Sequence, residues 1–240
     1  MIIAAAQIQP YDNTELNIAK HCHLIQLAMQ HDAELIIFPE MSLTGYQTEK
    51  AAENCFFEND NRLKPIQDII EGKGMTIIAG APIKLNTGEL CIGSFIINEK
   101  DITIYTKQYL HAGEEKFFSP HFDHDPLLTL GKEEVSVAIC ADINKVEHAA
   151  AAARNGSTLY AAGIFYRPER VSHAHNQLSG FAGQHHMNVL MANYVGRSYN
   201  GGGHSACWDK KGELIAELDG ECEGLLFAHI DKGICKKIYV

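Results

Sequence analysis

The sequence predicts an α/β protein in which large mixed sheets are covered by helices, and three observations support this prediction. Short apolar runs of strand length alternate with segments of helical spacing over most of the 240 residues. Two such stretches flank a central section whose neighbouring strands are joined by a short polar turn, which indicates antiparallel pairing. No change of composition marks a linker, so we expect a single domain over residues 1–240.

The first part of the chain has the pattern of alternating strands and helices. Residues 2–8 are apolar, which is typical of a buried strand. Asp12 and Glu15 have the spacing of a capping box, and apolar residues then recur at helical intervals, so we predict a helix over 14–31. The other elements expected here are a strand at 35–38 that is covered on both faces, a helix through Ile66 and Ile70, and a strand at 76–79.

The middle of the chain changes character before the alternation resumes. Residues 90–98 and 102–107 are predicted to pair as antiparallel strands. Residues 111–126 contain histidines and acidic residues without periodicity, and we predict a loop. The later elements expected are strands at 135–139, 159–162 and 189–193, helices at 144–154 and 172–187, and short antiparallel strands within 204–230.

Charge and cysteine content narrow the possible partners. The formal net charge of −10 and the scattered basic residues disfavour binding to phosphate backbones, so no nucleic-acid partner is expected. No run approaches the ~18 apolar residues that a membrane span requires, and the N-terminus lacks the features of a signal peptide, so no membrane partner is expected. Seven cysteines without a CxxC pair favour free thiols and a cytoplasmic location.

Three reactive residues stand at the ends of predicted strands, where ligand sites of open α/β sheets gather. They are Glu40, Lys107 and Cys140. If the strands before Glu40 and Cys140 are parallel neighbours, both side chains emerge at the same sheet edge. A thiol, a carboxylate that takes its proton and a lysine that binds an oxyanion suit attack on an amide carbonyl, without a metal or organic cofactor. Taken singly, each residue also fits an ordinary core or surface role.

The segments around these residues carry a family resemblance. They are LIIFPEMSLTGY at 35–46, YTKQYL at 105–110 and VAICAD at 137–142. In order and spacing they resemble the base, lysine and nucleophile segments of the nitrilase superfamily of carbon–nitrogen hydrolases. The resemblance extends over most of the chain. It implies a four-layer αββα sandwich with two mixed β-sheets, often assembled as a homodimer or larger homo-oligomer.

The resemblance also implies a second glutamate that holds the lysine, before an aromatic pair and a proline. Glu114 stands three residues before the pair that begins at Phe117, which is the family spacing, so we assign this role to Glu114. Glu115 is the alternative. His111 and His121 flank this segment, and we expect them at the mouth of the pocket.

Together these residues predict a cofactor-free hydrolase of a small linear amide, which releases ammonia or an amine through a thioester on Cys140. Nitrile hydrolysis, carbamoyl-amide hydrolysis and acyl transfer share this intermediate and stay open. Amidases are the commonest members of the family, so an amide substrate is favoured. Arg167 and Arg170, in the loop after the strand at 159–162, are candidates to bind the carboxylate of an anionic substrate.

Other classes of protein fit the sequence less well. The thirteen histidines include no helical pair four residues apart with a partner acid, so no metal site is expected. A Cys–His protease would need local signatures that are missing around Cys140, and residues 71–74 lack the glycine pattern of a phosphate-binding loop. The main alternative is a non-catalytic binding or scaffold protein on the same fold. Against it, all four expected catalytic positions hold the expected residue types.

Overall fold

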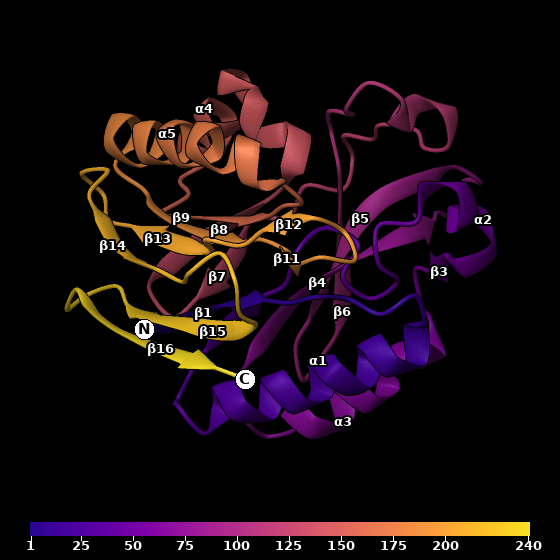
Figure 1. Cartoon of the computed structure of the whole chain (residues 1–240), viewed down its shortest axis with the longest axis horizontal. Helices are drawn as coiled ribbons and strands as arrows, with labels where there is room; N and C mark the ends of the chain where they lie inside the picture. The colour runs from indigo at the N-terminus through magenta and orange to yellow at the C-terminus, as the bar shows by residue number, and fades with distance from the viewer.

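In the computed structural model, which describes residues 1–240, two β-sheets lie face to face between two layers of helices (Figure 1). The layer below the sheets in this view contains α1 (Thr14–Met29) and α3 (Lys64–Ile70). The layer above contains α4 (Val146–Arg154) and α5 (Pro168–His185). This is the four-layer arrangement that the sequence resemblance implied.

The larger sheet has eight strands, in the order β16-β15-β1-β2-β4-β5-β6 with β3 paired to β4. Its centre is parallel, from β1 through β2 to β4, and antiparallel strands flank it on both sides. The strands are β1 (Ile2–Gln7), β2 (Leu35–Ile37), β3 (Phe56–Phe57), β4 (Thr76–Lys84), β5 (Leu90–Ile97), β6 (Ile102–Thr106), β15 (Gly224–His229) and β16 (Ile234–Tyr239).

The smaller sheet has six strands, in the order β14-β13-β10-β9-β8-β7, with β8, β9 and β10 parallel. A separate two-stranded ribbon joins β11 to β12. The strands are β7 (Leu128–Leu130), β8 (Glu133–Ile139), β9 (Leu159–Gly163), β10 (Asn188–Ala192), β11 (Val195–Gly196), β12 (Gly201–Gly202), β13 (Ala206–Trp208) and β14 (Leu214–Glu217).

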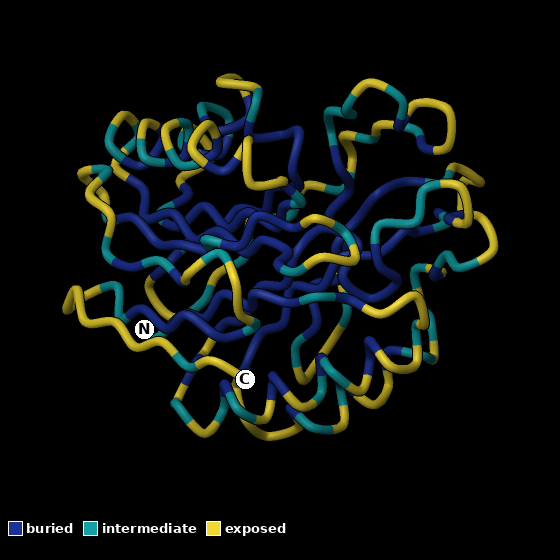
Figure 2. Tube along the Cα trace, in the orientation of Figure 1, coloured by how far each residue is buried: buried dark blue, intermediate teal, exposed yellow.

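The central strands are buried on both faces, which explains their unbroken apolar runs (Figure 2). Successive side chains point to opposite faces of a strand. In β1, Ile3 belongs to the cluster shared with the smaller sheet, whereas Ala4 belongs to the cluster under α1 and α3. In β2, Ile37 belongs to the cluster shared with the smaller sheet, and Ile36 belongs to the cluster under α1 and α3. The two sheets therefore share a dry interface, and each outer face is closed by helices.

Several local expectations were wrong. Asn13, not Asp12, caps α1, because its side chain accepts the hydrogen bond from the Leu16 amide at 2.8 Å. Asp12 accepts a hydrogen bond from the Tyr199 hydroxyl instead. Residues 140–144 form a 3₁₀ turn, so α4 begins later than expected. The short elements β3, β7, β16 and α2 (Ala51–Asn54) lack a strong apolar pattern and were not predicted.

The strands before Glu40 and Cys140 are β2 and β8, and they are not neighbours in one sheet. The strand β2 pairs with β1 and β4, whereas β8 pairs with β7 and β9. Across the interface between the sheets, β2 contacts β9, the neighbour of β8, and Ile37 and Val137 belong to the same core cluster. Glu40 and Cys140 therefore approach each other from different sheets.

Two glycines allow this close approach. A Cβ atom on Gly163, at the end of β9, would lie 2.6 Å from the carbonyl oxygen of Phe38. A Cβ atom on Gly80, in β4, would lie 2.4 Å from the amide nitrogen of Met41. Both contacts are far shorter than real Cβ contacts, so only glycine lets the segment around Glu40 pack against the middle of β4 and the end of β9.

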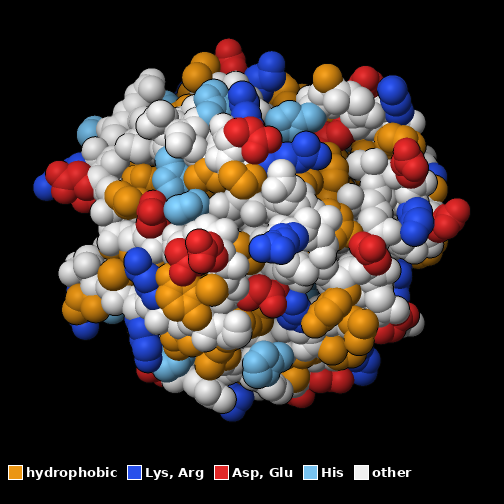
Figure 3. Space-filling model, in the orientation of Figure 1, with side chains coloured by type: hydrophobic (Ala, Val, Ile, Leu, Met, Phe, Trp, Pro, Cys, Tyr) orange, Lys and Arg blue, Asp and Glu red, His pale blue; other side chains and the backbone are white.

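The surface is mixed in charge on the face shown in Figure 3, where acidic and basic side chains alternate without a continuous patch of one sign. No helix combines the length and the apolar character that a crossing of the bilayer requires.

Candidate active site

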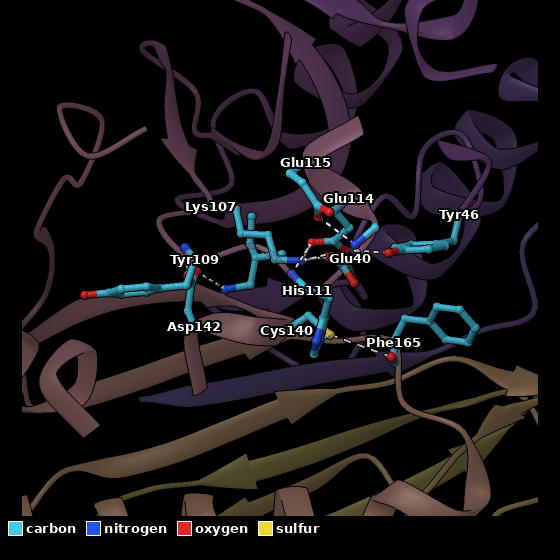
Figure 4. A network of polar contacts seen from close by, with 12 residues as sticks. Glu40, Tyr46, Lys107, Tyr109, His111, Glu114, Glu115, Cys140, Asp142 and Phe165 are labelled. Atoms are coloured by element: carbon cyan, nitrogen blue, oxygen red, sulfur yellow. Dashed lines mark hydrogen bonds and ion pairs between the residues drawn. The ribbon is translucent and has the colours of Figure 1, made fainter. Parts of the chain in front are cut away.

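Lys107 forms the centre of a buried cluster of charges at the end of β6. Its Nζ donates hydrogen bonds to Oε1 of Glu40 at 2.6 Å and to the two carboxylate oxygens of Glu114 at 2.9 and 2.8 Å (Figure 4). Lys107 is completely buried, and Glu40 and Glu114 are 1% and 4% exposed. The three residues come from separate segments, after β2, after β6 and in the loop before β7.

The structure places Glu114, not Glu115, beside the lysine. The carboxylate of Glu114 also accepts hydrogen bonds from the Tyr46 hydroxyl and from the backbone amide of His111, the latter at 2.8 Å. Glu115 is exposed, and its carboxylate accepts a hydrogen bond from the amide of Gly113 at 2.6 Å. Four donor contacts therefore fix the orientation of the Glu114 carboxylate against Lys107.

Cys140 begins the turn that follows β8 and is 1% exposed. Its φ of 43° lies in the left-handed region, which is uncommon for a residue with a side chain. The sulfur lies 3.3 Å from Nε2 of His111 and 3.7 Å from the carbonyl oxygen of Phe165. Oε2 of Glu40 is buried without a hydrogen-bond partner, and the neighbouring thiol acts on the pKa of that carboxyl group.

The electrostatics of the cluster keep Cys140 protonated as a thiol and give the Glu40 carboxyl group a pKa near neutral pH. Burial raises the pKa of Glu40 to about 7, although Lys107 opposes the shift. Burial and the negative charge of Glu40 raise the pKa of Cys140 well above its usual range. Burial lowers the pKa of Lys107, but the charges of the neighbouring acids outweigh it and raise that pKa overall. Lys107 is therefore an ammonium ion.

Asp142 links the turn that begins at Cys140 to the segment after Lys107. Its carboxylate accepts hydrogen bonds from the amides of Ile139 at 2.9 Å, Gln108 at 3.1 Å and Tyr109 at 2.9 Å. The hydroxyl of Tyr105 donates a fourth hydrogen bond at 2.7 Å. Sequence reasoning missed this role, although Asp142 lies inside the VAICAD segment, because three of its four partners belong to residues 105–109, which are distant in the chain.

Aromatic residues, a histidine and an arginine lie around the thiol. The His111 and Tyr166 rings are 6.2 Å apart, and the Tyr46 and Phe165 rings are 5.0 Å apart. The positive charge of Arg170 acts on the pKa values of both His111 and Tyr166, so this guanidinium lies near them.

The remaining candidates are the two arginines and His121. Arg167 precedes α5 as its N-terminal cap, but Arg170 lies in the first turn of α5 and not in the loop that the sequence predicted. Both arginines are exposed, and neither guanidinium forms a hydrogen bond or ion pair. The ring of His121 stacks on His124 and lies 4.0 Å from Asp123, whereas the backbone amide of His121 donates a hydrogen bond to the carbonyl of Lys107 at 3.2 Å. No group of three His, Cys, Asp or Glu side chains is arranged to hold a metal ion.

A four-layer sandwich with a buried cysteine, lysine and paired glutamates defines the class of nitrilase-superfamily hydrolases. The family model of the carbon-nitrogen hydrolases matches residues 2–238. The chain belongs to this family and is a carbon–nitrogen hydrolase.

Curated relatives are distant. The chain is 24% identical over 198 residues to "Hydrolase in agr operon" of Staphylococcus aureus, which covers 80% of this chain and 76% of that protein. It is 25% identical over 228 residues to a Glutamine-dependent NAD(+) synthetase of Thermotoga maritima, which covers 89% of this chain. The match spans only 39% of the synthetase.

Solved structures share the fold closely. Nit3 of Saccharomyces cerevisiae, described as a member of branch 10 of the nitrilase superfamily, has a TM-score of 0.88 at 21% identity and covers 97% of this chain and 90% of its own. A variant of the amidase from Nesterenkonia sp. AN1 has a TM-score of 0.84 at 23% identity, with 95% and 89% covered. In that variant the acetamide moiety of fluoroacetamide is covalently attached to the active-site cysteine. These matches confirm the predicted fold.

Proposed function

We propose that this hydrolase cleaves a small linear amide with Cys140 as nucleophile, Glu40 as general base, Lys107 as oxyanion donor and Glu114 as the residue that holds Lys107. One observation carries the proposal. A fully buried ammonium ion is held 2.6–2.9 Å from two carboxylates, next to a buried thiol and a Glu40 oxygen that has no partner.

In the first half of the reaction, the sulfur of Cys140 attacks the amide carbonyl carbon while its proton passes to Oε2 of Glu40. The carbonyl oxygen becomes an oxyanion that the Lys107 ammonium stabilises. The carbon–nitrogen bond then breaks, and Glu40 returns the proton to the departing nitrogen. Ammonia or an amine leaves, and the acyl group stays on Cys140 as a thioester.

In the second half, a water molecule attacks the thioester carbon and gives a proton to Glu40. The tetrahedral oxyanion again lies at Lys107, and its collapse breaks the carbon–sulfur bond. The proton on Glu40 returns to the sulfur and the carboxylic acid leaves. The net reaction consumes one amide and one water. A pKa of Glu40 near 7 suits a group that accepts and returns a proton in both halves.

A small acyl group fits the surroundings of Cys140, since this residue is almost fully enclosed and its sulfur lies 3.7 Å from the carbonyl oxygen of Phe165. The attachment of an acetamide moiety to the cysteine of the Nesterenkonia amidase agrees with this size. The unpaired guanidinium of Arg170 near Tyr166 favours an amide that also carries a carboxylate.

The proposal extends to the rest of the chain. We take residues 1–240 as one carbon–nitrogen hydrolase domain, in a cytoplasmic protein that assembles as a homodimer or larger homo-oligomer. All seven cysteines are free, which agrees with a reducing compartment. Light scattering during size-exclusion chromatography tests the oligomeric state.

The first test is a panel of small amides, including glutamine-like and carbamoyl compounds, with ammonia release and intact mass as readouts. Cys140→Ala is assayed in parallel. Ammonia release with an acyl adduct on the wild type alone would establish the amidase. If no amide of the panel released ammonia, and a thiol reagent did not label Cys140 preferentially, the result would favour a non-catalytic binding protein.

A further inference from the structure

His111 contacts the nucleophile, although the proposed mechanism gives it no role. Its Nε2 lies 3.3 Å from the sulfur of Cys140, within hydrogen-bonding distance for sulfur (Figure 4). The backbone amide of His111 donates a hydrogen bond to the Glu114 carboxylate at 2.8 Å. The same carboxylate that bonds Lys107 therefore also holds the backbone from which the imidazole extends to the thiol.

A count of protons assigns the direction of this contact. A thiol has a single hydrogen, and its sulfur is also a weak acceptor. In the proposed mechanism the hydrogen must point to an oxygen, since Glu40 receives it, and the carbonyl of Phe165 offers a second oxygen at 3.7 Å. The hydrogen between Cys140 and His111 must then belong to Nε2.

We propose that His111 is a further catalytic residue, a neutral imidazole whose Nε2–H donates a hydrogen bond to the sulfur of Cys140 and stabilises its thiolate. This inference rests on the proposed function of Glu40 as base. As the thiol proton passes to Glu40, negative charge develops on the sulfur and the hydrogen bond becomes charge-assisted, so it strengthens. When the thioester forms, the sulfur loses that charge and the hydrogen bond weakens.

The surroundings keep the imidazole uncharged. Burial, followed by the positive charge of Lys107, lowers the pKa of His111, and Glu114 opposes the shift while Arg170 adds to it. His111 therefore keeps the Nε2 proton throughout the cycle, unlike the histidine of a Cys–His protease, which takes the thiol proton. The titratable or charged groups that face the pair are Glu40, Tyr46, Lys107, Glu114, Tyr166 and Arg170.

The first test measures alkylation of Cys140 by iodoacetamide against pH in the wild type, His111→Phe and His111→Gln. His111→Phe loses the hydrogen bond to the Cys140 thiolate, so its alkylation at neutral pH should be about tenfold slower than that of the wild type. The rate should also rise at a higher pH than in the wild type. His111→Gln keeps an N–H donor and should recover much of the rate. Superimposed profiles for the wild type and His111→Phe would overturn the proposal.

A second measurement needs no variant to remain active. In protein labelled with ¹⁵N-histidine, the His111 signals are identified by their loss in His111→Gln, and their shifts report which nitrogen carries the proton. The proposal requires a neutral ring protonated at Nε2. A ring protonated only at Nδ1 would mean that His111 accepts the thiol hydrogen, and an imidazolium would mean a resting ion pair; either result overturns it.

These readouts separate the inference from the proposed function. Alkylation does not require amide turnover, so slower alkylation of His111→Phe would support the donor even if no amide of the panel were hydrolysed. Turnover of an amide, together with equal alkylation rates of the wild type and His111→Phe, would support the amidase and reject the donor. Glu40→Gln completes the set, because it should abolish turnover and leave the His111 tautomer unchanged.

Discussion

Lys107 donates a hydrogen bond to Oε1 of Glu40 at 2.6 Å, although 67 positions separate the two residues in the chain. The other two hydrogens of the ammonium face the two oxygens of Glu114. All three donors are therefore occupied before substrate arrives. To bind an oxyanion, Lys107 must give up one of these three contacts, and Glu114, which accepts two of them, has the larger share in orienting the ammonium.

This arrangement predicts that Glu114→Gln lowers kcat/KM by about a hundredfold or more, because a neutral amide cannot hold and orient the ammonium. Steady-state kinetics on the best amide of the panel measure the loss. Glu115→Gln is the matched control and should stay near wild type, since Glu115 is exposed and bonds only a backbone amide. A greater loss in Glu115→Gln would assign the second glutamate to Glu115.

The pKa of Glu40 predicts the pH dependence of activity. Since the base must be ionised, kcat/KM should rise with pH and level off above about 7. Stability should move the opposite way, because a carboxyl group whose pKa is raised from 4.5 contributes stability that is complete below 4.5 and is lost as pH rises through about 7. A kinetic inflection near pH 4.5 would show that burial does not perturb Glu40.

An anionic substrate should depend on Arg170 more than on Arg167. Only Arg170 lies near His111 and Tyr166, so Arg170→Ala should raise KM for carboxylate-bearing amides by about tenfold. Neutral amides should show little change. The comparison uses Arg167→Ala in parallel, and an equal effect on neutral and anionic amides would exclude a carboxylate contact.

The fold contains a buried histidine that should make stability sensitive to acid. His21 bonds the carbonyl of Asn17 and the hydroxyl of Ser42, and burial lowers its pKa from 6.5 to about 4. A lowered histidine pKa gives stability that is complete above 6.5 and is lost as pH falls towards 4, here about 3 kcal/mol. Urea unfolding at several pH values measures the free energy of unfolding, and in His21→Gln this free energy should fall less between pH 6.5 and 4 than in the wild type. The exposed His23→Gln, two residues along, should keep it.

Gly163 should tolerate no side chain. Gly163→Ala places a methyl group against the carbonyl of Phe38 and should push away the segment that carries Glu40, with a loss of about 1–3 kcal/mol of stability and a fall in kcat. Gly180→Ala in α5 is the control, since nothing lies within 4 Å of its added methyl group. It should be neutral or slightly stabilising. Equal thermal denaturation curves for both variants would contradict the proposed close packing.

Local patterns were enough to predict many of the strands, because the residues before Glu40 and Cys140 are buried and form clear apolar runs. The members of the charge cluster came from the family resemblance instead, which supplied the spacing that pointed to Glu114, the glutamate that lies beside Lys107. Pairing between distant strands leaves no such pattern, and for this reason the separation of β2 and β8 into two sheets was missed. The contacts of His111 and Asp142 depend on loop geometry, which residue spacing does not encode.

The division of the site between two sheets has a consequence for biosynthesis. Glu40 and Lys107 follow strands of the larger sheet, whereas Cys140 follows a strand of the smaller one. While the chain is being made, the thiol is an ordinary cysteine with no base beside it. Under the proposed roles, the thiol gains its base only when the two sheets dock, so an incompletely folded chain should not form the acyl-enzyme from an amide.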